Sequence, residues 1–323
     1  MKAVVLEKPC TANELAVCEV PVPNVKPGWV LIKIKAFGIN RSEIFTRQGD
    51  SPSVKLPRII GIECVGEIAD PSDSSFQEGQ RVVSLMGGLG REFDGSYAEY
   101  ALIPSSQVYP INNEMDWVKL AAIPEMFYTA YASLFDSLML KKEDVLLIRG
   151  GTSSVGIAAL QLAKSMGTTV ISTSRNKSKF QLLKQHGADF VFLDDENIQK
   201  QLHSVFPQGV SKVLELVGTV TLKDSLSMLT EKGILCMTGI LGGEWVLENF
   251  EPMTDIPSGT YFTQFDSGAN FKVKLLTELF EHISQFEIEV PIAKVFTLDG
   301  ISQAHLLMES NSANGKIVVV NPE

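Results

Sequence analysis

Hydrophobic residues are distributed differently in the two parts of this chain of 323 residues. Roughly the first 120 residues hold short runs of β-branched or alternating apolar residues, such as "WVLIKIKAFGI" and "QRVVSL", separated by turn sequences such as "VKPG" and "EGQ". Runs of this length, bounded by Gly, Pro and Asp, predict short β-strands. We therefore expect a mainly β, barrel-like domain in this part of the chain.

Further along, apolar strands alternate with amphipathic helices. From Asp144 onward, "VLLIRG" is followed by a helical pattern in "SVGIAALQLAKSMG", then by "TVISTS", and the alternation continues to "GILCMTGI". This alternation predicts a doubly wound parallel sheet with helices on both faces. After Gly259 the rhythm gives way to a long helical stretch and a last strand, "GKIVVV", which we expect to return to the first domain.

The composition argues against nucleic-acid and membrane partners. The net charge is -10 and no basic run is present, whereas binding to nucleic-acid phosphates requires a surplus of Lys and Arg on some face. No apolar run approaches the ~18 residues of a membrane span. The start, "MKAVVLEKPC", predicts a strand and not a secretory signal. The four cysteines lie far apart with no C-x-x-C pair, which predicts reduced thiols in a cytoplasmic protein.

One strand–turn–helix segment, "VLLIRGGTSSVGIAALQLAK" from Val145 to Lys164, is typical of a phosphate-binding turn. A helix N-terminus offers free N–H groups and a positive dipole end to a pyrophosphate, and small residues let the phosphate approach. Glycines allow the tight bend and close helix–sheet packing, while serines here replace a middle glycine with hydroxyl donors. The alternative is a structural turn in another kind of α/β sheet. We expect cofactor contacts from Gly151, Thr152, Ser153, Ser154, Val155 and Gly156.

The end of the next strand predicts which dinucleotide binds. In NAD-binding folds an Asp or Glu about 20 residues after the turn accepts hydrogen bonds from the ribose 2′-OH. Here the strand "TVISTS" ends at Ser174 and Arg175 follows, 19 positions after Gly156, with further lysines nearby. A positive strand end fits a 2′-phosphate, so we expect NADPH, held by Ser174, Arg175 and Lys179. Alternatively, "RNKSK" is only the solvated start of a helix.

Several motifs in this order resemble the medium-chain dehydrogenase/reductase superfamily over the whole chain. They are "GIECVGE", "DGSYAEYALIP", "AAIPEMFYTAYASL", the phosphate-binding turn and the closing "GKIVVV". Within the superfamily, "INRSEIFTRQG" and "AAIPE" resemble the zinc-free quinone oxidoreductases. The resemblance implies an α/β fold in two domains. Residues 1–122 and 259–323 would form a GroES-like β-barrel catalytic domain, and residues 123–258 a doubly wound parallel-sheet Rossmann domain that binds the nucleotide.

The resemblance also implies further site residues. Asn40 in "GINRSE" would be the catalytic residue, facing the nicotinamide and the substrate carbonyl as an amide donor. The alternative is a buried asparagine that caps the local turn. Thr129 would lie near the nicotinamide, or else would be a helix residue bonded to its own backbone. The other cofactor contacts implied are Gly239, Ile240, Leu241, Phe262, Thr263 and Lys316.

The zinc ligands of the alcohol dehydrogenases in this superfamily have no counterparts in this sequence. Ile62 in "GIEC" stands at the position of a ligating histidine, and isoleucine offers no lone pair. Asn40 or a neighbour stands at the position of the first cysteine. The segment "SLMGGLGREFDGSY" lacks the four cysteines of a structural zinc lobe. We expect no metal site, and we expect the four histidines, all in predicted helices, at the surface.

Without a metal to lower the pKa of an alcohol, hydride donation to an electron-poor acceptor is the simpler reaction. We therefore expect an NADPH-dependent quinone reductase acting on a small-molecule electrophile, and the resemblance implies a homodimer. One alternative is NADPH-dependent reduction of 2-alkenal or enoyl double bonds, which is disfavoured by Phe45 where many relatives have a tyrosine. The other is a non-catalytic NADPH-binding redox sensor.

Overall fold

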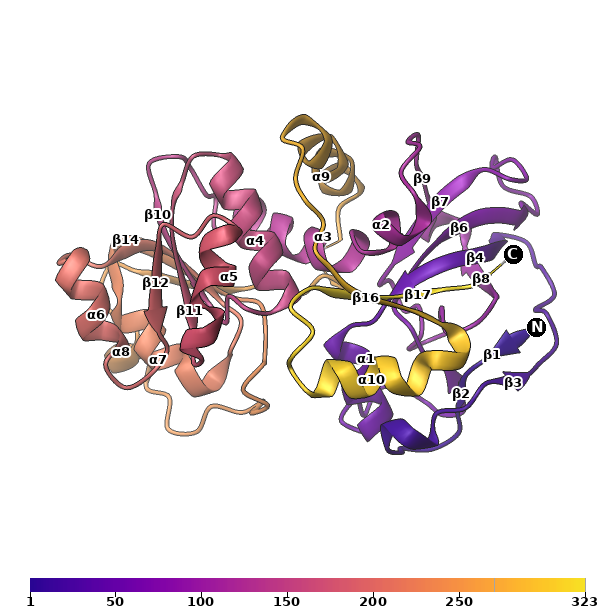
Figure 1. The fold of residues 1–323 in the computed structure, drawn as a ribbon, viewed down its shortest axis with the longest axis horizontal. Helices are drawn as coiled ribbons and strands as arrows, with labels where there is room; N and C mark the ends of the chain where they lie inside the picture. Colours follow the sequence, from indigo (N-terminus) through magenta and orange to yellow (C-terminus); the bar gives the residue numbers. More distant parts are fainter. Residues whose placement is uncertain (270, 323) are drawn as a thin grey trace. The chain divides into compact units, whose positions relative to one another are not determined.

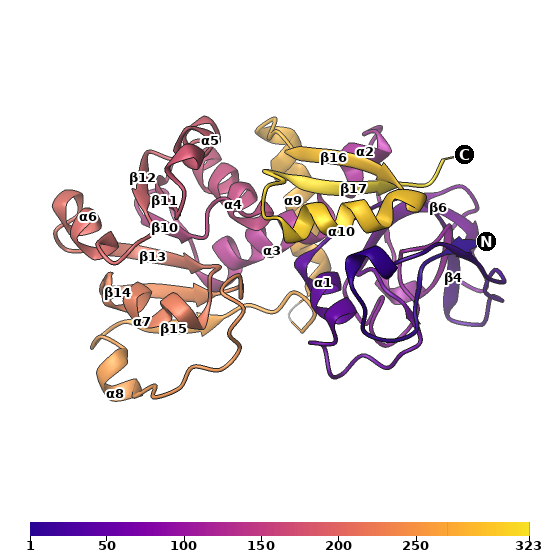
Figure 2. The ribbon, with the colours of Figure 1, turned by 60° about the horizontal axis from the view of Figure 1, so that its bottom comes forward.

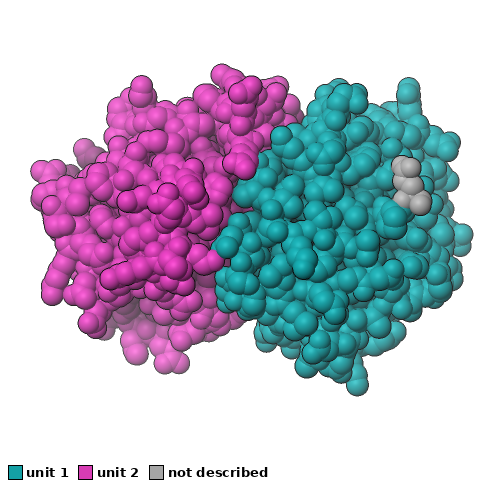
Figure 3. Space-filling model, viewed as in Figure 1, with its two compact units in different colours: residues 1–125, 290–323 teal, residues 126–289 magenta. Residues whose placement is uncertain are grey.

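The computed structural model describes residues 1–269 and 271–322, and the chain forms two compact units (Figure 3). Unit 1 comprises Met1–Glu125 and Val290–Glu323, and unit 2 comprises Met126–Glu289. Both ends of the chain therefore belong to unit 1, as the closing strand predicts. Over the described residues, no helix combines the length and the apolar character needed to cross a membrane.

Unit 1 is built on a seven-stranded sheet. Its strands are β4 (Trp29–Gly38), β6 (Glu63–Asp70), β7 (Arg81–Leu85), β8 (Tyr100–Pro104), β9 (Tyr109–Pro110), β16 (Ile292–Thr297) and β17 (Lys316–Val320). They are ordered β16–β17–β4–β6–β7–β9, and β8 also pairs with β4. Two short pairs accompany the sheet, β1 (Lys2–Ala3) with β3 (Cys18–Glu19) and β2 (Val5–Leu6) with β5 (Arg58–Ile59). The mainly β first domain is therefore confirmed.

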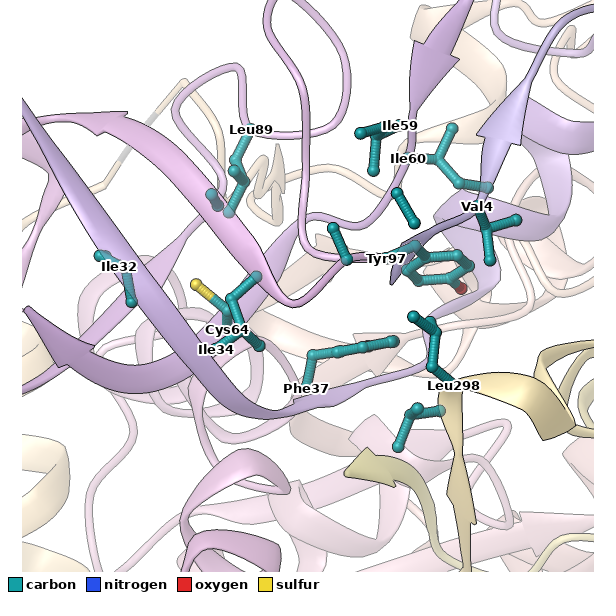
Figure 4. Packing of buried hydrophobic residues seen from close by; sticks show 14 of the residues in the cluster. Val4, Ile32, Ile34, Phe37, Ile59, Ile60, Cys64, Leu89, Tyr97 and Leu298 are labelled. Atoms are coloured by element: carbon teal, nitrogen blue, oxygen red, sulfur yellow. The ribbon is translucent and has the colours of Figure 1, made fainter. Parts of the chain in front are cut away.

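Strand β17 joins the end of the chain to its beginning. It pairs antiparallel with β4, with Val318 opposite Gly38, and parallel with β16. Strand β4 is buried over nearly its whole length because it pairs with β17, β6 and β8. In the core beside it, the rings of Phe37 and Tyr97 stack with their centroids 5.0 Å apart (Figure 4). The predicted return of the last strand to the first domain is confirmed.

Three helices accompany the sheet of unit 1: α1 (Arg41–Gln48), α2 (Trp117–Ala121) and α10 (Ile301–Glu309). Helix α1 follows β4 after only two residues, and α10 lies beside it (Figure 1). Helix α1 begins after Asn40, and Gly49, with a φ of 92°, ends it. Glycine suits that position because the left-handed conformation carries no Cβ penalty. The segment between β4 and α1 therefore holds Asn40 at the end of a central strand.

Unit 2 is built on a six-stranded parallel sheet with helices between the strands. Its strands are β10 (Val145–Arg149), β11 (Thr169–Ser174), β12 (Phe190–Leu193), β13 (Val210–Glu215), β14 (Leu229–Met237) and β15 (Tyr261–Gln264). Its helices are α3 (Pro124–Ala132, entering from unit 1), α4 (Ser154–Ser165), α5 (Phe180–Gln185), α6 (Ile198–Val205), α7 (Thr219–Ser227), α8 (Pro252–Asp255) and α9 (Val273–Gln285). Figure 2 shows helices on both sides of this sheet, so the predicted doubly wound architecture is confirmed.

The strand order of unit 2 locates the expected ligand position. The order is β12–β11–β10–β13–β14–β15, so the chain moves outward from β10 in one direction and from β13 in the other. Helix α4 packs on β10 and β11, whereas α7 packs on β13 and β14. In open parallel sheets, ligands bind beyond the carboxyl ends of the strands where the order reverses. The turn after β10 lies at that point.

Unit 2 extends further along the chain than the expected boundary at residue 259. Strand β15 pairs in parallel with β14, with Thr263 opposite Cys236, so the sheet continues beyond that residue. Helix α9 also belongs to unit 2, where His282 Nε2 and Ser165 Oγ are 2.7 Å apart. Residues 259–289 therefore belong with the parallel sheet. The four residues of β15 are mostly exposed and carry no apolar pattern that would have predicted the strand.

Candidate active site

The predicted phosphate-binding turn connects β10 to α4. Ser153 is the N-cap of α4, and its Oγ accepts a hydrogen bond from the Gly156 amide (3.1 Å) and donates one to the Gly150 carbonyl (2.9 Å). The Ser153 hydroxyl therefore holds the turn together. The amides of Ser154 and Val155 have no acceptor in the described part of the chain. Such free amides in the first turn of a helix can bind an anion.

Two glycines of this turn leave no room for a side chain. A Cβ on Gly151 would lie 1.9 Å from Ser172 Oγ, and a Cβ on Gly156 would lie 2.7 Å from the carbonyl oxygen of Gly150. At Gly151 the backbone of the turn therefore packs directly on β11, and at Gly156 it packs directly on the backbone of Gly150. Small residues of this kind let a pyrophosphate reach the free amides, so the turn fits a dinucleotide.

The end of β11 presents a cation, as the sequence predicts. Arg175 follows the strand with an exposed side chain, and among the described residues its guanidinium has no hydrogen-bond or ion-pair partner. Ser174 is 7% exposed, and its Oγ donates to the backbone oxygen of Asn176 at 3.2 Å, so its hydroxyl is engaged locally. Lys179 ends a short 3₁₀ turn before α5. Arg175 is therefore the residue best placed to meet a phosphate at this strand end.

The segment after β14 approaches the same edge of the sheet. The amide of Leu241 donates to the carbonyl of Leu216, just beyond β13, at 3.0 Å. A Cβ on Gly239 would lie 2.5 Å from that carbonyl oxygen, and a Cβ on Gly150 would lie 3.1 Å from Leu241 Cδ1. The structure thus brings Gly239, Ile240 and Leu241 together with the turn after β10.

Three other expected cofactor contacts lie elsewhere in unit 2. Phe262 and Thr263 are in β15, and the side chain of Phe262 is 38% exposed. Thr129 is buried in α3. Their contacts with a cofactor stay predictions.

In unit 1, Asn40 and Lys316 belong to one buried polar cluster. Lys316 Nζ lies 2.6 Å from Glu63 Oε1 and donates to Asn40 Oδ1. Asn40 Nδ2 donates to Glu63 Oε1 at 2.8 Å, whereas Glu43 Oε1 is 3.4 Å away. An ammonium on the amide oxygen and a carboxylate on the amide nitrogen fix the orientation of Asn40. Asn40 is the N-cap residue of α1 by position, but its side chain is held by the cluster.

Glu43 is the titrating member of this cluster. It accepts hydrogen bonds from the amides of Asn40 and Ile62, both at 3.1 Å. Burial raises the pKa of the Glu43 carboxyl to about 7, and the neighbouring Glu63 charge adds to that effect. Near neutral pH, Glu43 is therefore partly protonated.

Gly38, the last residue of β4, makes room for the cluster. A Cβ at this position would lie 2.2 Å from Lys316 Cε and 2.4 Å from Glu63 Oε1. No side chain larger than that of glycine fits here without displacing the ion pair. The Lys316–Glu63 ion pair, which joins β17 to β6, therefore requires glycine as the last residue of β4.

Ile62 and the four histidines are the positions on which the predictions about metal ligands depend. Ile62 is buried, and within residues 1–269 and 271–322 no group of three or more His, Cys, Asp or Glu side chains is arranged to hold a metal ion. The expectation that all histidines lie at the surface is wrong. His305 is fully buried with its Nε2 2.8 Å from Tyr97 Oη, and burial lowers the pKa of its imidazole to about 3. His282 is buried beside the ring of Tyr131.

Sequence reasoning missed three charged residues that organise these sites. Glu63 stands between Ile62 and Cys64 in "GIEC", where an acid between apolar residues was the available signal, and Glu43 stands in "SEIF". Arg149, the last residue of β10, is 4% exposed; its Nη2 lies 2.7 Å from Asp194 Oδ1, and its Nη1 pairs with Asp224. A buried arginine directly before the glycine turn therefore ties the end of β10 to the residue after β12.

Comparisons with known proteins divide the chain in the same way. Residues 26–113 match the family model "Alcohol dehydrogenase GroES-like domain", and residues 154–265 match "Zinc-binding dehydrogenase". A quinone oxidoreductase of Lama guanicoe is 30% identical over 308 residues, which cover 94% of this chain and 92% of that protein. An acryloyl-coenzyme A reductase of Sulfurisphaera tokodaii is 24% identical over 345 residues, covering 99% of each chain.

A solved structure agrees over the whole length. A mycobacterial protein in complex with NADPH superposes with a TM-score of 0.87 at 25% identity, covering 99% of each chain. The GroES-like first unit, the Rossmann-type second unit and a nicotinamide cofactor are thus supported together. The chain belongs to the medium-chain dehydrogenase/reductase superfamily and is an oxidoreductase.

Proposed function

We propose that this oxidoreductase reduces quinones with NADPH and without zinc. The observation that carries the proposal is the exposed, unpaired Arg175 at the end of β11, beside a glycine turn with free amides. A carboxylate at this strand end would select the ribose hydroxyl of NAD, whereas a guanidinium offers charge-assisted hydrogen bonds to a 2′-phosphate. The quinone oxidoreductases among the relatives support the acceptor class.

In this proposal NADPH supplies a hydride, and the chain orients the acceptor. The amide nitrogen of Asn40 uses one hydrogen for Glu63 at 2.8 Å, while its second faces Glu43 only at 3.4 Å. That second hydrogen is available to an acceptor oxygen on which negative charge develops. Lys316 and Glu63 position it by fixing the amide. A hydroquinone anion then takes its proton from water, so the reaction needs no strong acid.

We also propose that the reaction proceeds without zinc. Ile62 stands where a ligating histidine would stand, and Asn40 is occupied by the Lys316–Glu63 pair. Alcohol oxidation in the superfamily relies on a Lewis acid to acidify the hydroxyl. Hydride donation to a quinone does not.

A second candidate, NADPH-dependent reduction of 2-alkenals or enoyl thioesters, is supported by the similarity to an acryloyl-coenzyme A reductase. Phe45 in α1 argues against acid-assisted enoyl reduction, since its ring offers no acidic hydroxyl. The third candidate is a non-catalytic NADPH-binding sensor, which would bind the cofactor but not turn over.

We propose a homodimer formed through β15. This strand ends the parallel sheet, so one row of its backbone N–H and C=O groups has no partner strand in the order β12 to β15. Tyr261 and Phe262 on it are 59% and 38% exposed. A second β15 at this edge would cover both. For the compartment we propose the cytoplasm, because all four cysteines are free thiols.

The test is steady-state oxidation of NADPH with 9,10-phenanthrenequinone, alongside trans-2-hexenal and crotonyl-coenzyme A as competing acceptors. We expect a higher kcat/KM for the quinone than for either enoyl compound. Preference for an enoyl compound would support the second candidate. Binding of NADPH, measured by its fluorescence, without turnover of any acceptor would identify a sensor.

A further inference from the structure

Two arginines at the start of α1 have no carboxylate partner among the described residues. Arg41, the first residue of α1, donates from Nη2 to Asn311 Oδ1 at 2.5 Å. Arg91 donates from Nη2 to Ser42 Oγ at 2.6 Å. Neither guanidinium lies within ion-pair distance of an acid in the described part of the chain. Arg91 thus contacts the residue that follows Arg41 in α1, two positions after Asn40.

The local charge balance is opposite to that of the whole chain, whose net charge is -10. The acids of α10 and of the cluster around Asn40 are already engaged by other groups or partly neutral. Glu309 of α10 pairs with Arg47, and Glu63 pairs with Lys316. Glu43 is partly protonated near neutral pH. Arg41 and Arg91 therefore lack an ion-pair partner in the described part of the chain.

Burial disfavours the charged form of the Arg41 guanidinium. The desolvation of its guanidinium lowers its pKa, while the Glu309 charge acts in the opposite direction. A partly desolvated cation that has only a neutral amide as partner gains most from an anion, because a charge-assisted hydrogen bond replaces lost hydration.

Arg91 is held in place by its loop. The carbonyl of Gly88 accepts hydrogen bonds from the amides of Arg91 (3.0 Å) and Glu92 (2.7 Å). A Cβ on Gly90 would lie 2.4 Å from the carbonyl oxygen of Gly61, so the loop packs backbone to backbone against the residue before Ile62. The position of Arg91 is thus fixed relative to the cluster around Asn40.

We propose that Arg41, Arg91 and the hydroxyl of Ser42 bind an anionic group of the acceptor, a carboxylate, sulfonate or phosphate. This rests on the proposed function, in which Asn40 meets the acceptor oxygen. Asn40, Arg41 and Ser42 are consecutive residues with neighbouring Cα atoms about 3.8 Å apart, so the proposed anion site adjoins in the chain the residue that meets the acceptor carbonyl. Ser42 accepts from Arg91, which leaves its own hydrogen for the ligand. The physiological acceptor is then an acidic quinone or unsaturated carbonyl compound.

The experiment compares 1,2-naphthoquinone with 1,2-naphthoquinone-4-sulfonate as acceptors for wild type, Arg41→Gln, Arg91→Gln and the control Lys33→Gln. Lys33 is an exposed cation of β4 in the same unit, so the control removes one charge away from the cluster. Each acceptor is referred to its own wild-type rate, which cancels differences in quinone reactivity. We expect kcat/KM for the sulfonate to fall about 10-fold or more in both arginine variants, with less than threefold change for the neutral quinone. Lys33→Gln should change neither.

Calorimetric binding of 2-naphthoate and 2-naphthol to the wild type and the same variants gives a second readout that needs no turnover. Weaker binding of the carboxylate alone in the arginine variants supports the site even if no quinone is reduced, which separates it from the proposed function. Equal losses for charged and neutral compounds would overturn the proposal. So would a loss of NADPH affinity with unchanged NADH affinity in either arginine variant, because the anion would then be the cofactor's phosphate.

Discussion

Lys316 and Glu63 form an ion pair of 2.6 Å in which the two side chains are 0% and 1% exposed. They come from β17 and β6, which lie on either side of β4 in the sheet of unit 1. Burial of a charge is unfavourable unless it is paired and hydrogen-bonded, and here each partner has further bonds. Lys316 also donates to Asn40, and Glu63 also accepts from the Glu125 amide at 2.8 Å. The pair therefore links the C-terminal strand to the proposed catalytic asparagine.

Replacing Lys316 by methionine should leave Glu63 as a buried, uncompensated carboxylate. Removing one member of such a pair typically costs about 3–5 kcal/mol of unfolding free energy. The double variant Lys316→Met with Glu63→Gln should lose less than the sum of the two single variants. Urea unfolding of the wild type, both single variants and the double variant measures the coupling. Additive losses would show that the two charges do not stabilise each other.

Glu43 should make the stability of the protein depend on pH. Its folded-state pKa of about 7 lies above the value of about 4.3 for an unfolded glutamate, so the folded protein holds the proton to higher pH. The unfolding free energy should therefore fall as pH rises from about 4.5 to about 7, by roughly 3 kcal/mol in total. Glu43→Gln should remove this slope; Gln keeps one acceptor oxygen, so one of the two backbone amides that bond to Glu43 loses its acceptor. An unchanged slope in the variant would assign the dependence to other groups.

The fold was predictable from the sequence because its strands and helices have clear periodic patterns. The runs assigned to β10, β11, β12, β13 and β14 all form strands of the parallel sheet. Strand β15 was missed because it is short, exposed and preceded by a long irregular segment, so its position is set by pairing with β14. Burial of His305 was missed for a similar reason. Its hydrogen bond to Tyr97, 208 positions away, cannot be read from local sequence.

The candidate site was only partly predictable. The turn after β10 is local in sequence, so its glycines and Arg175 could be identified from spacing. The bond between Lys316 and Asn40 joins residues 276 positions apart, and the sequence pattern gave no reason to pair them. The hydroxyls of Ser153 and Ser174 were expected to bind phosphate, yet both are engaged by backbone atoms of their own turns. Short polar side chains often form such local bonds, which compete with ligand contacts.

Asn40→Ala should reduce turnover with quinones by about 10²-fold while leaving the affinity for NADPH nearly unchanged. The reason is that its second amide hydrogen, which faces Glu43 Oε1 only at 3.4 Å, is proposed to act on the developing oxyanion. Thr46→Ala is a matched control, because Thr46 is a buried residue of the same helix whose hydroxyl bonds to Ser42 and Ser51. The control should lose stability without losing turnover. If both variants keep full turnover and lose stability alike, Asn40 is only a cap of α1.

The purified protein should contain no stoichiometric zinc and should keep its activity in the presence of a chelator. Ile62 offers no ligand atom where a histidine would be needed, and Asn40 is already bonded to Lys316 and Glu63. Elemental analysis combined with assays in EDTA tests this directly. One equivalent of zinc, with activity lost on its removal and restored on its return, would contradict it.

Arg175 should set the preference for NADPH over NADH. A 2′-phosphate carries close to two negative charges, and only charge-assisted hydrogen bonds, each worth about 1.5–3 kcal/mol, offset the loss of its hydration. The hydroxyl of Ser174 is engaged by Asn176, so Arg175 carries most of the discrimination. We expect roughly 10- to 150-fold higher kcat/KM with NADPH than with NADH. Arg175→Ala should abolish that preference and leave NADH kinetics almost unchanged, because NADH does not use the guanidinium.

Lys177→Ala, which removes an exposed cation two residues further on, should largely preserve the preference for NADPH. Equal damage to both cofactors in Arg175→Ala, or a wild type that prefers NADH, would show that Arg175 only begins the following helix.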